Sequence, residues 1–540
     1  MSEQRGAVTW VPADDAWDSS VMAEFAEHVE ADDGLRLRSY DDVLDWSLRQ
    51  PGEFWNELAQ WQRINWIDKP TASLESASMP GATWFPGGTL NYAERALAHG
   101  AALGDQIAII GRSQSRERDE VTWTELIDRV GRCRVGLRRL GIRRGDRVVA
   151  FAPNISETLV AFLATASLGA TWSSCAPEFG VRAVTDRWAQ IEPTVLIAVD
   201  GYMYGDRAID RSDHVEEIVA ALPTLEHVVR IPYLDASGTD GWTPLLAEHA
   251  PLEFEPVRFD HALYVLFSSG TTGLPKASVM THYRWLAAMA GVGGMTLGIR
   301  RKDVFYCCLP LYHNNALTVA WGSVLSMGAS LALDRKFSAS QFWERVRHYD
   351  ATVFCYIGEL LRYLLNVKPC PTDRQHRIRL ITGNGLRPEV WTPFQERFGI
   401  DRIVEFYGAT EGNLPIFNIP GRVGAVGYLP GFARKALGME IVKFDVDTDE
   451  LVRDAKGRCI RCAPEEAGEL VVKITKTARF EGYTNDAASE KKILRGGFVD
   501  GDTYFRTGDL LRADEDGFYY FVDRIGDTFR WKGENVSTSE

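Results

Sequence analysis

Apolar and polar residues alternate along this chain in blocks that predict strands and helices in turn. Arg147–Phe151 and Ala170–Ser173 are short apolar runs typical of buried strands, and Glu157–Leu168 between them has the length and periodicity of a helix. This order of strand, helix and strand is a βαβ unit, which favours a parallel sheet covered on both faces.

Similar alternation returns later in the chain and predicts a second α/β subdomain. Its expected elements are Val304–Leu309, Phe342–His348, Thr352–Cys355 and Arg379–Ile381. The uncharged segment Ala316–Leu333 is near the length of a membrane span but is interrupted by Gly, Ser and Thr. We interpret it as a buried helix followed by a strand.

Both ends of the chain have a different pattern. Residues 1–100 are rich in Trp, with apolar positions at helical spacing over Phe54–Trp66, and predict a helical extension packed by its aromatic side chains. After the Gly- and Pro-containing stretch Pro420–Gly438, the runs Glu469–Lys473 and Gly517–Phe521 alternate like antiparallel strands. The sequence therefore predicts a smaller β subdomain after the two α/β subdomains.

Composition and charge exclude several classes of protein. A chain of 540 residues with 45% apolar residues is long enough for several packed layers of an ordinary globular protein. The net charge of −14 gives no support for nucleic acid as a partner, since phosphate neutralisation requires a basic face. Eight cysteines are too few for a disulfide framework, and the lone C-x-x-C of Cys459 and Cys462 does not predict zinc.

The first residues of the sequence bear on where the protein works. Met1–Trp17 has acidic residues and no apolar run, so it is neither a secretory signal nor a transit peptide. We predict a cytoplasmic protein without a transmembrane segment. Peripheral contact with a membrane is left open.

The strongest chemical signal is one nine-residue run, Ser268-Ser269-Gly270-Thr271-Thr272-Gly273-Leu274-Pro275-Lys276. The apolar run Tyr264–Phe267 before it predicts a buried strand, so the loop leaves the edge of a sheet. Its glycines permit close approach to an anion, its four hydroxyls offer donors, and Lys276 supplies a positive charge. Ala277 stands where a Walker A loop has Ser or Thr, which argues against the P-loop kinases and GTPases. The run predicts a phosphate-binding loop; a solvated turn is the structural alternative.

This loop resembles the signature loop of the adenylate-forming superfamily, which includes acyl-CoA synthetases, luciferases and the adenylation domains of peptide synthetases. Further matches follow in the expected order: Tyr407-Gly408-Ala409-Thr410-Glu411, then Thr507-Gly508-Asp509, then Asp523-Arg524 running on to Lys532-Gly533. Together they cover much of the second half of the chain.

The resemblance implies a fold and a domain order. The fold class is α/β: a large adenylate-forming domain over 101–522, made of two α/β subdomains and a small distorted β-barrel, after the extension 1–100. The family has a mobile C-terminal domain that supplies a catalytic lysine, and only the stub 523–540 matches it. The resemblance therefore implies either truncation or impaired adenylation.

The two halves of the chain resemble different members of the superfamily. Residues 1–260 resemble acetoacetyl-CoA synthetases, notably at 84–92 and 162–175. Residues 261–540 resemble the fatty acid transport protein and very-long-chain acyl-CoA synthetase group. The matching segments of this second half are 309–314, 382–386 and 528–536.

The second half contains the acyl pocket in this family. Gly408 and Ala409 leave room where acetate-type enzymes place a bulky Trp, which favours a longer apolar tail. The resemblance thus implies an ATP-dependent acyl-CoA synthetase for a medium- or long-chain fatty acid. The alternatives are an acetoacetyl-CoA synthetase and a nucleotide-binding protein deficient in adenylation.

The resemblance also assigns roles to residues and names the partners: ATP, CoA and a carboxylic acid as substrates, with Mg²⁺ as cofactor. Lys276 and the loop donors would hold the β- and γ-phosphates, and Thr410 would contact the α-phosphate. Glu411 would ligate Mg²⁺, an oxygen-seeking cation. Basic residues that would contact CoA are poorly defined around Gly201–Arg211.

Other residues would bind the nucleoside and guard the reacting carboxylate. Asp509 would accept hydrogen bonds from the ribose hydroxyls, and Arg524 would contact ribose or phosphate. His313 would be a gate near the reacting carboxylate and the thiol entrance. The residues that would frame adenine are Gly383, Asn384, Gly385 and Tyr407.

Each of these nucleoside-side assignments has a structural alternative. Asp509 can cap a turn, Arg524 can be a solvated hinge charge, and His313 can be an ordinary surface or core histidine. The segment 383–385 can be a strand-to-helix turn followed, at Tyr407, by a core aromatic.

Overall fold

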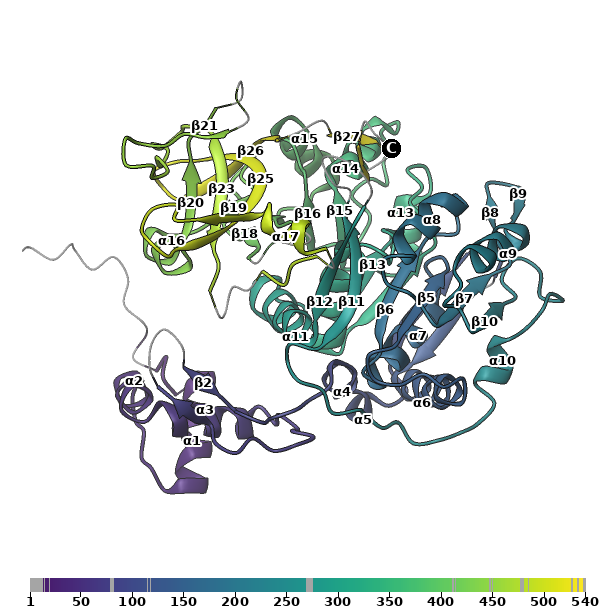
Figure 1. Cartoon of the computed structure of the whole chain (residues 1–540), viewed down its shortest axis with the longest axis horizontal. Helices are drawn as coiled ribbons and strands as arrows, with labels where there is room; N and C mark the ends of the chain where they lie inside the picture. The colour runs from purple at the N-terminus through teal and green to yellow at the C-terminus, as the bar shows by residue number, and fades with distance from the viewer. Residues whose placement is uncertain are drawn as a thin grey trace, which may run out of the picture. The chain divides into compact units, whose positions relative to one another are not determined.

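The structure is a computed structural model of the chain (Figure 1). The residues that it describes are 13, 15–18, 20–77, 82–113, 115–116, 118–268, 275–409, 412, 414–445, 448, 450–475, 480–483, 485–525, 528–531 and 534–537. The chain divides into two compact units, one formed by Met1–Leu90 with Pro256–Arg258 and the other by Asn91–Glu255 with Phe259–Glu540.

The first unit is a small helical cluster with one hairpin. Its elements are α1 (Val21–Asp33), α2 (Tyr40–Arg49), α3 (Pro51–Trp61), β1 (Leu74–Ser76) and β2 (Thr83–Trp84). Phe25 lies at its centre, with its ring 6.3 Å from that of Trp46 and 5.4 Å from that of Trp61. The predicted helix over Phe54–Trp66 ends early, at Trp61, because Arg63 adopts a left-handed backbone with φ of 51°.

The second unit contains a six-stranded sheet in the order β10-β7-β5-β6-β11-β12. Its strands are β5 (Arg147–Phe151), β6 (Thr171–Cys175), β7 (Val195–Val199), β10 (His227–Ile231), β11 (Ala262–Ser268) and β12 (Lys276–Thr281). The strands are parallel except for the hairpin of β11 and β12. The predicted βαβ unit is confirmed, with α7 (Ser156–Ser167) as its helix.

The second unit also contains an eight-stranded sheet in the order β18-β17-β16-β15-β13-β14-β3-β4. Its strands are β3 (Ile107–Arg112), β4 (Asp119–Thr122), β13 (Val304–Cys307), β14 (Ser330–Asp334), β15 (Val353–Ile357), β16 (Leu380–Asn384), β17 (Ile403–Tyr407) and β18 (Ile416–Asn418). All are parallel except the two edge strands, β4 and β18. The chain passes from β13 to β14 on one side and then to β15 on the other, so the winding of the sheet reverses at β13.

Helices connect the strands of this sheet. They are η2 (Asn315–Trp321), α12 (Gly322–Met327), α13 (Phe342–His348), α14 (Gly358–Asn366) and α15 (Pro388–Phe398). The uncharged segment Ala316–Leu333 forms η2, α12 and most of β14, which confirms a buried helix followed by a strand. Across the described part of the chain, every helix is too short or too polar to span a bilayer.

A third, antiparallel sheet lies at one end of the second unit and is green to yellow in Figure 1. Its strands are β19 (Gly427–Tyr428), β20 (Met439–Val442), β23 (Gly468–Lys473), β24 (Ile493–Arg495), β25 (Thr503–Ala513) and β26 (Phe518–Arg524). The predicted antiparallel strands are confirmed. In place of the expected small distorted barrel, the pairing of the described residues gives an open sheet that ends at β19 and β20.

The remaining elements are shorter or lie at the periphery. They are α4 (Tyr92–Leu97), α5 (Gly100–Leu103), α6 (Trp123–Arg139), α8 (Val181–Trp188), β8 (Gly201–Tyr204), β9 (Arg207–Asp210), α9 (Ser212–Ala221), α10 (Trp242–Leu245), α11 (His282–Ala290), η1 (Gly291–Thr296), α16 (Gly431–Leu437), β21 (Phe444–Asp445), β22 (Glu450–Leu451), α17 (Asp486–Glu490), β27 (Thr528–Trp531) and β28 (Glu534–Ser537).

His282, the first residue of α11, is a buried titratable group in the core of the second unit. Its Nδ1 accepts a hydrogen bond of 3.0 Å from the backbone N–H of Tyr92. Burial and the neighbouring His261 lower the pKa of His282 from 6.5 to about 3. The folded protein therefore holds this imidazole neutral, while the unfolded chain protonates it below pH 6.5.

We expect His282 to weaken the fold in acid. The free energy of unfolding falls as the pH drops from 6.5 towards 3, because only the unfolded chain gains a proton on His282. The loss is about 3 kcal/mol at pH 4. His282→Gln should therefore flatten the dependence of the melting temperature on pH over this range, whereas replacement of the exposed His348 should not. Equal pH slopes for wild type and His282→Gln in thermal unfolding would contradict the assignment.

Candidate active site

The predicted phosphate-binding loop joins β11 to β12. Ser268 and Lys276 face each other at the open end of this hairpin. Because β11 runs parallel to β6, the loop emerges at the edge of the sheet where the parallel strands end. The predicted loop residues Ser269, Gly270, Thr271, Thr272 and Gly273 lie outside the described residues. Lys276 Nζ lies 5.5 Å from the centre of the Tyr483 ring.

Three other predicted residues lie where parallel strands of the eight-stranded sheet end. His313 lies in the connection after β13, Asn384 ends β16, and Tyr407 ends β17. Asn315 Nδ2 donates to Asn384 Oδ1 at 2.7 Å and so ties the connection after β13 to the end of β16. Ligands of open α/β sheets bind at the carboxyl ends of strands, where the winding reverses, and this edge of the sheet fits that rule.

Tyr407, Asp509 and Arg524 come together although they lie far apart in the sequence. Tyr407 OH donates to Asp509 Oδ2 at 2.6 Å, and Arg524 Nε lies 3.2 Å from Asp509 Oδ1. Burial of the phenol and the adjacent Asp509 carboxylate raise the pKa of Tyr407 well above its ordinary value. Tyr407 therefore stays a neutral donor, and the Asp509 carboxylate is held in a fixed orientation by one residue from each of two sheets.

The backbone around Asp509 is also fixed. Asp509 is only 4% exposed, and its N–H donates to Thr507 Oγ1 at 3.1 Å. Gly508 has a φ of 77°, which favours glycine, and its N–H donates to Glu469 Oε1 at 3.1 Å. The carboxylate is thus presented from a rigid turn in β25.

The glycines predicted to frame adenine have a packing role of their own. A Cβ atom at Gly383 would lie 2.1 Å from the carbonyl oxygen of Tyr356 on the neighbouring strand, so the spacing of β15 and β16 already requires glycine. Gly385 is exposed with a φ of 81°. Gly408 is exposed and Ala409 half-buried after β17.

Two predicted residues, Thr410 and Glu411, lie outside the described residues.

Asn154, which follows β5, was not among the residues predicted from the sequence. It is buried, and its Nδ2 donates to the carbonyl oxygens of Leu309 and Asp334 at 2.8 and 3.0 Å. Its Oδ1 accepts from the N–H of Leu311 at 2.9 Å. One amide thus joins the end of β5 to the ends of β13 and β14, and positions the connection that contains His313. The available signal was a polar residue three positions after the apolar run Arg147–Phe151.

We expect Asn154→Leu to destabilise the protein by about 3 kcal/mol, because three buried backbone groups lose their partners. Hydrogen exchange at the Leu311 amide should accelerate, and the melting temperature should fall. Asn366→Leu, at an exposed position, is the matched control. Unchanged exchange at Leu311 would show that Asn154 does not hold this connection.

Curated sequences with extensive similarity are fatty-acid enzymes and transport proteins. The chain is 42% identical over 403 residues to the medium/long-chain fatty-acid CoA ligase FadD6 of Mycobacterium tuberculosis, covering 74% of this chain and 64% of that protein. It is 40% identical over 413 residues to long-chain fatty acid transport protein 2 of Rattus norvegicus, with the same coverage of 74% and 64%. The chain thus spans less than two thirds of the length of both relatives.

Solved structures show similarity over a larger part of the chain. The acetoacetyl-CoA synthetase from Streptomyces lividans superimposes with a TM-score of 0.72 at 29% identity, covering 96% of this chain and 80% of that one. The anthranilate CoA ligase AuaEII in complex with anthranoyl-AMP has a TM-score of 0.67 at 22% identity, covering 83% of this chain and 80% of that one. The predicted α/β fold of the adenylate-forming enzymes is confirmed.

Two family profiles together match residues 40–484 of the chain. The profile described as acetyl-coenzyme A synthetase N-terminus matches residues 40–96. The profile described as AMP-binding enzyme matches residues 97–484, which is more than half of the chain. The chain therefore belongs to the AMP-binding enzyme family.

Proposed function

We propose that this chain is an AMP-forming acyl-CoA synthetase whose acid substrate is a medium- or long-chain fatty acid. The observation that carries the proposal is the contact of Tyr407 and Arg524 with the buried carboxylate of Asp509, beyond the strand ends of the eight-stranded sheet. An ionised carboxylate fixed in this way is suited to accept hydrogen bonds from the two hydroxyls of a ribose.

The chemistry requires the carboxylate of the acid to gain a better leaving group. A carboxylate oxygen attacks the α-phosphorus of ATP, and pyrophosphate leaves. The thiol of CoA then adds to the carbonyl carbon of the acyl-adenylate, loses its proton, and expels AMP. Since two anions meet in the first step, neutralising their charge is the main task of the protein.

The residues of this chain divide that task. Lys276, at the open end of the hairpin, would neutralise the β- and γ-phosphates together with the donors of the preceding loop. Asp509 would hold the ribose, with both of its oxygens already oriented by Tyr407 and Arg524. Mg²⁺, when bound, would neutralise further phosphate charge; Glu411 is the residue proposed to hold it. His313 would stand between the acid and the thiol.

Similarity to the fatty-acid CoA ligase supports a fatty acid as substrate, because the match extends at 42% identity over 74% of this chain. Acetoacetate is the second candidate, favoured by the structural likeness to an acetoacetyl-CoA synthetase over 96% of the chain. Coenzyme A-dependent release of AMP should be measured with palmitate and with acetoacetate. Faster release with palmitate is the expected result.

The same assay separates the remaining alternatives. Faster release with acetoacetate would overturn the fatty-acid assignment. ATP affinity without AMP release from either acid would favour a nucleotide-binding protein deficient in adenylation. Cytoplasmic location remains a prediction.

A further inference from the structure

The helical cluster of the first unit places one imidazole and two carboxylates close together. They belong to His28 and Asp32 on α1 and to Glu57 on α3, and one ligand atom of each lies within 4.8 Å of the other two. Imidazole nitrogen and carboxylate oxygen are both ligands of zinc and related divalent metals. All three residues lie in the first unit, whereas the residues assigned to ATP and the acid lie in the second.

The packing of α1 against α3 brings these side chains together. The ring centres of Phe25 on α1 and Trp61 on α3 are 5.4 Å apart. His28 and Asp32 follow Phe25 at helical spacing, so they continue along the same face of α1. Glu57 precedes Trp61 by one helical turn. The cluster therefore continues the aromatic contact between the two helices.

Glu57 is a buried carboxylate without a cation. It is 6% exposed, and its Oε1 accepts from Asn56 Nδ2 at 3.1 Å and from Gln60 Nε2 at 3.0 Å. Among the described residues, no Lys or Arg pairs with it and its Oε2 has no donor. Burying a charged group costs folding free energy unless the group is paired or coordinates a metal. Amide donors on one oxygen orient the carboxylate and leave the other oxygen for a metal.

The Nε2 atom of His28 is enclosed but unsatisfied. Within the described part of the chain it is buried and has no hydrogen-bond partner. It lies 3.5 Å from Asp32 Oδ2, which is long for a hydrogen bond. Two ligand atoms of a tetrahedral zinc ion lie about 3.4 Å apart, because each bond to the metal is about 2.0–2.2 Å long. The spacing of these two atoms therefore suits a shared ion better than a direct contact.

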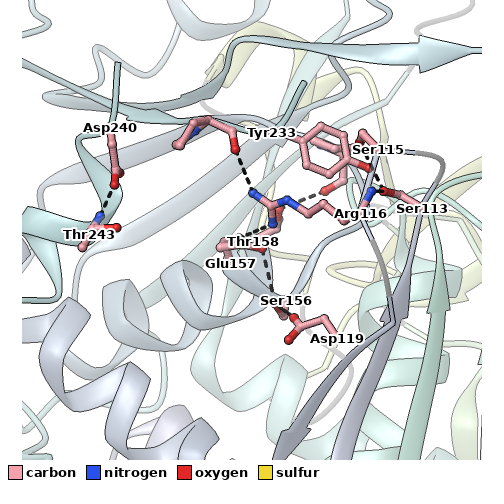
Figure 2. Close-up of polar contacts among 12 residues, drawn as sticks. Ser113, Ser115, Arg116, Asp119, Ser156, Glu157, Thr158, Tyr233, Asp240 and Thr243 are labelled. Carbon is pink, nitrogen blue, oxygen red and sulfur yellow. Dashed lines mark hydrogen bonds and ion pairs between the residues drawn. The ribbon is translucent and has the colours of Figure 1, made fainter. Parts of the chain in front are cut away.

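Neighbouring carboxylates in the second unit show how this protein otherwise balances such charges. Asp119 and Glu157 both accept from Ser156 Oγ, at 2.6 and 3.3 Å (Figure 2). Arg116 donates to Glu157, and a guanidinium nitrogen of Arg129 lies 4.0 Å from Asp119 Oδ1. Guanidinium groups thus offset the repulsion between those two carboxylates. The carboxylates of the first unit have no such partner among the described residues.

We infer that His28, Asp32 and Glu57 bind a zinc ion that fastens α1 to α3. Two carboxylates balance the charge of a divalent ion, the imidazole supplies a third ligand, and water can fill the fourth position. The imidazole favours zinc over Mg²⁺, which takes oxygen ligands in octahedral geometry. The aromatic core of the first unit is small, and small units gain stability from a metal that links their helices.

The other occupant that fits the cluster is a proton. A protonated His28 would bridge the two carboxylates without any metal, as a buried ion pair. The two possibilities differ in their response to zinc, which can be measured on the whole chain after treatment with a chelator. This test does not depend on whether the chain releases AMP in the presence of an acid.

A first pair of variants uses adjacent residues of α1. Asp32 and Asp33 are both exposed, but Asp33 is five positions after His28 and lies on a different face of the helix. In calorimetric titration with zinc chloride, we expect Asp32→Asn to bind zinc at least about tenfold more weakly than Asp33→Asn. Zinc should also raise the melting temperature less in Asp32→Asn than in Asp33→Asn. Without metal, the two variants should melt together.

A second pair tests the imidazole. His28→Gln should lose the same zinc site, whereas His249→Gln should retain it, because His249 is an exposed histidine of the second unit. All four variants keep the eight cysteines of the chain, so a difference within either pair reports the cluster and not binding to thiols. Hydrogen exchange in α1 and α3 should slow when zinc is added to wild type and remain unchanged in His28→Gln.

The outcomes decide for or against the metal. Loss of zinc binding in Asp32→Asn and His28→Gln, with retention in both controls, supports the site. Equal zinc affinities within each pair, or no zinc binding by wild type, would leave the proton as the occupant and overturn the inference. Binding of Mg²⁺ as tightly as zinc would also overturn it, because His28 would then have no part in choosing the ion.

Discussion

Replacing Asp509 by Asn is expected to weaken ATP binding about a hundredfold. The carboxylate is proposed to accept charge-assisted hydrogen bonds from two ribose hydroxyls, each worth about 1.5–3 kcal/mol. An amide keeps the shape of the side chain but loses the charge and turns one acceptor into a donor. It also leaves Arg524, which lies 3.2 Å from Asp509 Oδ1, without its partner.

Control variants separate ribose binding from damage to the fold. Asp523 is exposed on the neighbouring strand, so Asp523→Asn removes the same charge without touching the turn at Gly508. Tyr407→Phe removes one of the two groups that orient Asp509 and should weaken binding by about tenfold. Calorimetric titration with ATP measures all three variants.

One result would contradict the proposed role of Asp509 in binding ribose. If Asp509→Asn binds ATP as tightly as Asp523→Asn while both melt at the wild-type temperature, Asp509 is a turn-capping residue only. Such a result would leave the family assignment unchanged, because that rests on the match over residues 97–484.

Local elements could be predicted from the sequence because their causes are local. The predicted strand Arg147–Phe151 has the same bounds as β5, and the predicted helix Phe342–His348 has the same bounds as α13. In each segment the spacing of apolar residues fits only one regular structure, and that structure also buries those residues in the folded protein. The helix predicted to reach Trp66 failed because the left-handed backbone at Arg63 leaves no periodic signal.

The arrangement of these elements depends on contacts that no single segment encodes. The small β subdomain was expected to close into a barrel, but closure depends on which strands pair at its edges, and β19 and β20 end an open sheet. Asn154 was missed for a similar reason. Its three partners are on β14 and the connection after β13, more than 150 residues further along the chain.

The candidate site could be predicted in part. The resemblance singled out Tyr407, Asp509 and Arg524 separately, and the structure brings them into contact although Asp509 lies 102 positions after Tyr407 in the sequence. Tyr407 was predicted as a stacking face for adenine, yet its hydroxyl also orients Asp509.

Replacing Lys276 by Met is expected to reduce acyl-adenylate formation about a thousandfold. Met keeps much of the length and apolar stem of Lys but removes the charge proposed to neutralise the triphosphate as two anions approach each other. Because this repulsion grows as the carboxylate nears the α-phosphorus, the loss should be larger in the rate of adenylate formation than in ATP affinity.

A comparison of two lysines tests this assignment. Lys302→Met removes the same charge from an exposed position just before β13 and should leave both quantities unchanged. Acyl-adenylate formation is measured as pyrophosphate release in single-turnover experiments with palmitate, and ATP affinity by calorimetry. In the structure Lys276 Nζ lies 5.5 Å from the centre of the Tyr483 ring. To bind a triphosphate, the Lys276 ammonium would move away from this ring. If Lys276→Met releases pyrophosphate as fast as Lys302→Met, that aromatic contact is the function of the lysine, and the hairpin of β11 and β12 does not neutralise the nucleotide through it.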